Sequence, residues 1–131
     1  MVRYLIAFPL IMHGLAHASG LAASGSPEKA GFTTRPWIFS PNVYLHKGLG
    51  RFFTLLWLLA MGGLVAAGLG LALQKAWWPS LAAAASGVSL AVILPWWNTV
   101  PPGAKLGALF DVLLLAVLLT PLRESVPGMI P

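Results

Sequence analysis

Three ionisable side chains lie deep inside long apolar stretches of this sequence: His13, His17 and Asp111. A charge among apolar neighbours is costly, so such residues are the first candidates for a function. His13 and His17 are four residues apart and therefore share one face of a helix. A histidine oriented by a carboxylate can act as a general acid or base near neutral pH. These three are the candidate catalytic residues, and we expect Asp111 within hydrogen-bond reach of His13 or His17, directly or through one water.

A second group of polar and aromatic side chains is predicted to surround the same site. When successive helices alternate in direction, the end of the first, the start of the second, the end of the third and the start of the fourth share one side of a bundle. The residues on that side or in the loop beyond it that suit ligand binding are His46, Arg51, Trp37, Trp96, Trp97 and Asn98. The opposite side has little that is comparable, so the pattern predicts a polar cavity that opens on one side.

Several interpretations of the candidate catalytic residues stay open. A hydrogen bond between them can simply hold two helices together. A cavity can use them to orient a lipid, a quinone or another hydrophobic molecule. An isomerase or hydrolase can use histidine as an acid or base on an apolar substrate. The spacing His-x-x-x-His also suits two metal ligands on one helix, but it often arises by chance, so no metal site is predicted and the cofactor stays open.

The composition indicates which solvent surrounds these residues. Of the 131 residues, 58% are hydrophobic and 8% are charged, and the mean hydropathy of +0.83 lies outside the range of soluble proteins. The net charge of +5 comes from scattered basic residues, which argues against a nucleic-acid-binding patch. Without cysteine, thiol chemistry and thiolate metal sites are excluded. The chain is therefore predicted to be an integral membrane protein in contact with membrane lipid.

Uninterrupted apolar length divides the chain into four predicted membrane-spanning helices. Each span needs about 20 residues, and the apolar stretches run over 4–23, 52–73, 76–97 and 104–120. They predict one transmembrane domain, 1–131, an all-α four-helix bundle of up-down-up-down topology. The loop 24–46 is rich in aromatic residues and proline. We expect it to pack over the mouth of the bundle, with Trp37 and Phe39 against Trp96 or Trp97.

Small residues recur where the predicted helices would touch. Helices in lipid associate through close approach of their backbones, so small residues four apart mark packing faces. Internal packing of the bundle is the expected role of this pattern, and a homo-oligomer is the alternative. The clearest positions are Gly14 with Ala18, Gly62, Gly63, Ala66 and Gly70 in the second span, 82–87 in the third, and Gly103 with Gly107.

Several features along the chain point to one known group of proteins. They are Arg3 at the start of the first span, the step His13-Gly14 within it, Gly48 and Gly50 before a second span that contains Trp57, and Asp111 in the last span. In these features the chain resembles the DoxX-like group of small four-helix bacterial membrane proteins, over its whole length and at the level of topology. The resemblance implies an integral protein of a bacterial or archaeal cytoplasmic membrane with an accessory or quinone-linked redox role.

Overall fold

A computed structural model describes residues 1–25, 48–97 and 103–125, and within these ranges the chain is all-α, without a β-strand. The helices are α1 (Val2–Ala16), α2 (Ala18–Gly25), α4 (Leu49–Ala72), α5 (Trp78–Ile93) and α6 (Gly103–Leu118), followed by a short 3-10 helix, η1 (Pro121–Ser125). Compared with the predicted spans, the third and fourth helices are shorter, and the first stretch forms two helices. The predicted aromatic loop lies almost entirely outside the described residues.

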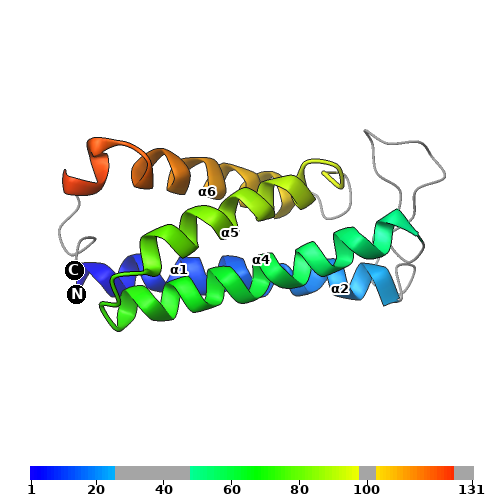
Figure 1. Cartoon of the computed structure of the whole chain (residues 1–131), viewed down its shortest axis with the longest axis horizontal. Coiled ribbons are helices and arrows are strands. Elements are labelled where there is room, and N and C mark those ends of the chain that lie inside the picture. The colour runs from blue at the N-terminus through cyan, green and yellow to red at the C-terminus, as the bar shows by residue number, and fades with distance from the viewer. Residues whose placement is uncertain (26–47, 98–102, 126–131) are drawn as a thin grey trace.

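The helices form a bundle in which successive members run in opposite directions, with α2 continuing the course of α1 (Figure 1). Helix α4 packs along α1, α2 and α5, and α5 packs along α6. The N-terminus, the turn between α4 and α5 and the end of α6 therefore lie at one end of the bundle (Figure 1). The ends of α2 and α5 and the starts of α4 and α6 lie at the other.

The first apolar stretch is interrupted at His17, the only residue between α1 and α2. In a continuous helix the His17 N–H would donate to the carbonyl of His13. It donates instead to Gly14 O at 3.0 Å, in the tighter pattern of a 3-10 turn. The Nδ1 atom of His17 then donates to the vacated carbonyl of His13 at 2.9 Å. A side chain thus replaces a backbone donor, which is a recognised cause of helix breaks.

The turn between α4 and α5 follows the Schellman pattern of helix termination. The N–H of Lys75 donates to Gly70 O at 2.8 Å and the N–H of Gln74 donates to Leu71 O at 3.1 Å. Gln74 occupies the left-handed position, with φ of 54°, where glycine is the usual residue. Pro79 then falls in the first turn of α5, where its missing N–H costs no helical hydrogen bond. The helix accordingly begins at Trp78 rather than at residue 76.

Two apolar clusters fill the bundle, one toward each end. The first includes Leu10, Leu64 and Leu71, and the second includes Trp57 and Trp96. All five side chains are at most 4% exposed. His17 and Asp111 lie between the two clusters along the bundle axis. The polar residues therefore form a layer between two apolar regions.

Glycines allow the helices to approach closely, as the sequence predicts. A Cβ atom on Gly14 would lie 2.9 Å from the backbone nitrogen of Val65 in α4, and one on Gly63 would lie 2.8 Å from Cβ of Ala85 in α5. The prediction of internal packing is confirmed at these positions. It is wrong at Gly62, where an added Cβ would meet nothing within 4 Å.

Two helical stretches, Val2–Ala22 and Leu49–Ala72, are long and apolar enough to cross a membrane by length and composition. Helix α5 is apolar but shorter.

Gly14→Ala should destabilise the bundle, because its new methyl group meets a backbone atom of α4 that cannot move alone. We expect a loss on the order of 1–3 kcal/mol, as for overpacking elsewhere. Gly62→Ala is the matched control, since it adds the same methyl group to open space and gains up to about 1 kcal/mol of helix propensity. Thermal unfolding in detergent measures both, and equal effects would contradict the close approach of α1 and α4.

Candidate functional site

The polar layer at the middle of the bundle consists of His13 and His17 from the first helical stretch, Ser89 from α5 and Asp111 from α6. Asp111 and Ser89 are 0% exposed and His17 is 2% exposed. The side chain of His13 retains 10% of its surface. A carboxyl group withdrawn so completely from solvent requires hydrogen-bond partners, because an unpaired buried charge is strongly unfavourable.

The partners of Asp111 come from two other helices. Nε2 of His13 donates to Oδ1 of Asp111 at 3.1 Å, which confirms the predicted proximity of this pair. The other carboxyl oxygen, Oδ2, forms a short hydrogen bond with Oγ of Ser89. Both carboxyl oxygens are therefore engaged, and Asp111 connects α6 to α1 and to α5.

Ser89 extends the connection to the second histidine. Its Oγ lies 2.8 Å from Nε2 of His17 and, more distantly, 3.5 Å from Nε2 of His13. Since Nδ1 of His17 donates to the carbonyl of His13, the bonds form one chain from His13 through Asp111, Ser89 and His17 back to the His13 backbone. His17 thus reaches Asp111 only through Ser89.

Ser89 is the central residue that sequence reasoning missed. A serine in an apolar helix commonly hydrogen-bonds its own backbone, so it carries no sign of a function by itself. Ser89 falls near the middle of its predicted span, as His13 and Asp111 do in theirs, but depth alone does not distinguish it from the other small residues of that stretch. Ser86, one turn earlier, is equally buried, and among the described residues its hydroxyl has no hydrogen-bond partner.

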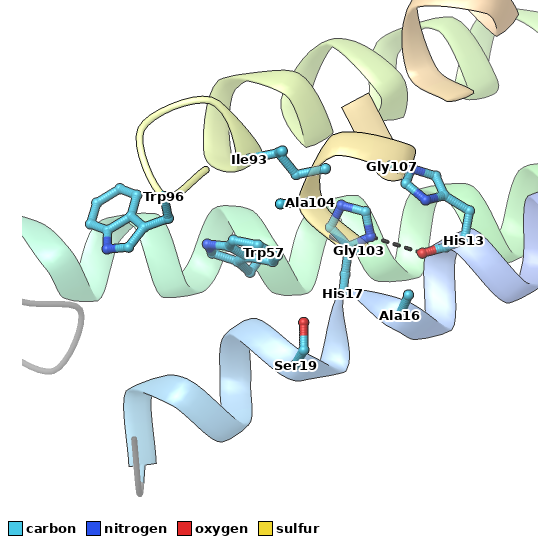
Figure 2. Close-up of a pocket in the computed structure, with 10 residues that line it drawn as sticks. All are labelled: His13, Ala16, His17, Ser19, Trp57, Ile93, Trp96, Gly103, Ala104 and Gly107. Carbon is cyan, nitrogen blue, oxygen red and sulfur yellow. Dashed lines mark hydrogen bonds between the residues drawn. The ribbon is translucent and has the colours of Figure 1, made fainter. Parts of the chain in front are cut away.

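A pocket of about 270 Å³ lies beside the polar layer, on the side of the second apolar cluster. Figure 2 shows its residues, which come from the first helical stretch, α4, the end of α5 and the start of α6. Ala16 and Gly103 are exposed and mark its mouth, whereas Trp57 and Trp96 are buried at its floor. The complete lining is His13, Ala16, His17, Ser19, Trp57, Ile93, Trp96, Gly103, Ala104 and Gly107.

Two glycines make room for the rings of this site. A Cβ atom on Gly20 would lie 2.3 Å from the indole of Trp57, so Gly20 lies directly against that ring. A Cβ atom on Gly107 would lie 3.0 Å from Cε1 of His13. The ring centroids of His17 and Trp57 are 5.4 Å apart. The histidines are thus held between close helical backbone and aromatic surface, which restricts their rotation.

The predicted ligand-binding residues divide into three groups. Trp96 lines the pocket as expected. Trp97 packs against the second apolar cluster, and Arg51 is exposed on the first turn of α4. Neither is among the residues that line this pocket, and their role in ligand binding stays a prediction. Trp37, His46 and Asn98 lie outside the described residues, as does the predicted packing of Trp37 and Phe39 against Trp96 or Trp97.

Metal chemistry depends on several ligands converging on one point. Within residues 1–25, 48–97 and 103–125, no three side chains of histidine, cysteine, aspartate or glutamate are grouped to hold a metal ion. The arrangement instead suits the holding of a proton and of a hydrogen-bonded partner at the wall of an apolar pocket.

Ser89→Ala should destabilise the protein, because it leaves buried atoms of both Asp111 and His17 without their partner. The expected loss is about 1–3 kcal/mol. Ser86→Ala is the control: it removes a hydroxyl of the same burial from the same helix, but one without a partner in the described structure. We expect it to be neutral or slightly stabilising in thermal unfolding. If Ser86→Ala is as unstable as Ser89→Ala, the hydrogen bonds of Ser89 do not add to the stability of the protein.

Comparison with known proteins finds no match to this chain among family models, curated proteins or solved structures.

Proposed function

We propose that this chain is an integral membrane protein that binds a hydrophobic molecule, such as a lipid or a quinone, in the pocket between the first helical stretch and α6. The observation that carries the proposal is the pocket itself, which combines an apolar floor of Trp57, Ile93 and Trp96 with His13 and His17 on one wall. Ligand sites typically pair a mostly apolar lining with a few placed polar groups. A purely structural hydrogen-bonded pair would need no adjoining cavity.

Placement in a membrane is supported by how side chains are distributed between the surface and the interior. Large apolar residues face outward on α1, α4 and α6: Leu5 is 70% exposed, Leu59 62% and Leu113 57%. The interior holds the ionisable group Asp111, which is fully buried and paired. Exposure of such an apolar surface is unfavourable in water and favourable in the hydrocarbon of a membrane. Ionisable residues inside a membrane usually face the interior of the bundle and pair there.

Access from the hydrocarbon region is supported by the surroundings of the mouth. Met12 precedes Ala16 by one helical turn, and Leu106 follows Gly103 by nearly one turn. These two side chains are 49% and 65% exposed. An apolar molecule dissolved in the membrane would therefore meet apolar side chains on both sides of the opening.

The volume of the pocket limits its occupant. About 270 Å³ lies just below the 300–1,000 Å³ that is typical of small-molecule sites. It suits one ring system or a short segment of chain rather than a whole lipid. We therefore propose that the ring or head group of the ligand enters the pocket while any long tail remains between the helices and the surrounding lipid.

A second candidate function, acid-base catalysis on such a molecule, is favoured by one specific contact. The bond between His13 Nε2 and Asp111 orients the imidazole at the pocket wall. This is the relation between a histidine base and its orienting carboxylate in many enzymes. An isomerase or hydrolase would then convert the bound molecule, and its product would differ from the molecule that first bound.

Native mass spectrometry of the protein extracted in mild detergent tests the binding proposal. We expect a bound hydrophobic molecule, and we expect Ala16→Trp to lose most of it, because an indole at this position fills the mouth without touching the polar layer. Ala116→Trp is the control, since residue 116 is exposed on α6 and does not line the pocket. Equal retention by both variants, or no bound molecule in the unaltered protein, would contradict the proposal. A bound molecule whose structure changes on incubation would favour the catalytic candidate.

A further inference from the structure

Apart from the distant contact of 3.5 Å between Ser89 and His13, four hydrogen bonds connect the polar layer, and each requires one hydrogen atom. A carbonyl oxygen can only accept, so Nδ1 of His17 must carry a hydrogen for its bond to His13 O. Neutral His13, neutral His17 and Ser89 each supply one hydrogen, three in total, whereas an ionised Asp111 supplies none. The four bonds therefore exceed the available hydrogens by one.

One additional proton completes all four bonds and cancels the charge of Asp111. It can reside on Asp111, which then donates to Ser89 while Ser89 donates to His17. It can equally reside on His17, which then donates to Ser89 while Ser89 donates to an ionised Asp111. The formal charge of the layer is zero in both arrangements. Because Asp111 and Ser89 have no exposed surface, a layer without net charge is the state that this burial favours.

Both arrangements leave the same atom unused, namely Nδ1 of His13. Because all four bonds are completed only when Nε2 of His13 supplies the hydrogen of its bond to Asp111, Nδ1 of the neutral ring carries a lone pair and no hydrogen. The Nδ1–Cε1 edge of the ring lies over Gly107, where an added Cβ would be 3.6 Å from Nδ1. His13 and Gly107 both line the pocket. Within the described part of the chain, Nδ1 has no hydrogen-bond partner.

From this hydrogen count we infer that the pocket selects a hydrophobic alcohol or phenol, whose hydroxyl donates a hydrogen bond to Nδ1 of His13. The inference rests on the proposed binding function and narrows its ligand to molecules that carry a hydroxyl group, so that a hydroquinone binds more tightly than the corresponding quinone. A quinone, an ester or an ether offers only acceptor atoms and would place a lone pair against that of Nδ1. A hydroxyl on a ring, as in a phenol or a hydroquinone, supplies the missing hydrogen within the available volume.

Three probes of nearly the same shape separate these possibilities: 2-naphthol, 2-methoxynaphthalene and naphthalene. The ether keeps the oxygen of the phenol but lacks its hydrogen, and the hydrocarbon lacks both. Binding of each probe to the full-length protein in detergent is measured by calorimetry. In Ala16→Trp the mouth of the pocket is filled, so the heat measured with this variant reports partition of the probe into micelles. That heat is subtracted from the heat measured with the unaltered protein. We expect 2-naphthol to bind about three- to tenfold more tightly than the ether, which corresponds to one neutral hydrogen bond.

The variant His13→Phe keeps a ring of similar size without its nitrogens and should lose the preference for 2-naphthol. Equal affinity for all three probes in the unaltered protein, or tighter binding of the ether, would overturn the inference while leaving the pocket intact as a binding site. A preference that persists in His13→Phe would overturn its assignment to His13. If none of the probes binds to the unaltered protein more than to Ala16→Trp, the proposed function itself would be overturned. The comparison in the unaltered protein is decisive even if the His13 variant does not fold.

Discussion

Asp111 imposes the constraint on which the rest of the bundle depends, because its carboxyl group is fully buried and must be satisfied by other side chains. Its two oxygens form hydrogen bonds with His13 of α1 and with Ser89 of α5. Few backbone atoms of α1 and α6 come close to one another, whereas α1 and α5 both pack closely on α4. The hydrogen bond between Asp111 and His13 therefore adds a direct connection between α6 and α1, and the pocket lies between the first helical stretch and the start of α6.

The break at His17 follows from the same constraint. For Nε2 of His17 to reach Ser89, Nδ1 must point back along its own helix, where it meets the carbonyl of His13. That carbonyl is available because the His17 N–H bonds to Gly14 instead. Local backbone geometry and the polar layer thus support each other. Buried polar groups of this kind are stabilising when every member is satisfied and costly when one is not.

The sequence predicts the apolar helices and the depth of the polar residues, because hydrophobic length and the cost of burying charge are local properties. The pairing of Asp111 with His13 or His17 was predicted from depth and helical face together. Ser89 could not be found in this way, since a hydroxyl adds little cost to an apolar helix and its partners are set by packing. The interruption of the first helix depends on which direction the His17 ring points. Similar depth also does not determine which side chains line the pocket, so Trp96 lines it whereas Arg51 and Trp97 do not.

Nitrogen-15 NMR of the rings of His13 and His17, in protein reconstituted in lipid bilayers at neutral pH, tests the central claim most directly, because it reports which ring nitrogens carry hydrogen. The arrangement of the polar layer predicts that His13 is neutral with hydrogen on Nε2 alone, and that His17 carries hydrogen on Nδ1. The chain has three histidines, so the variants His13→Phe and His46→Phe, each of which removes one set of signals, together assign the spectrum. Hydrogen on Nδ1 of His13, or a His17 ring protonated on Nε2 alone, would contradict the proposed hydrogen-bonded chain and the acceptor it presents to the pocket.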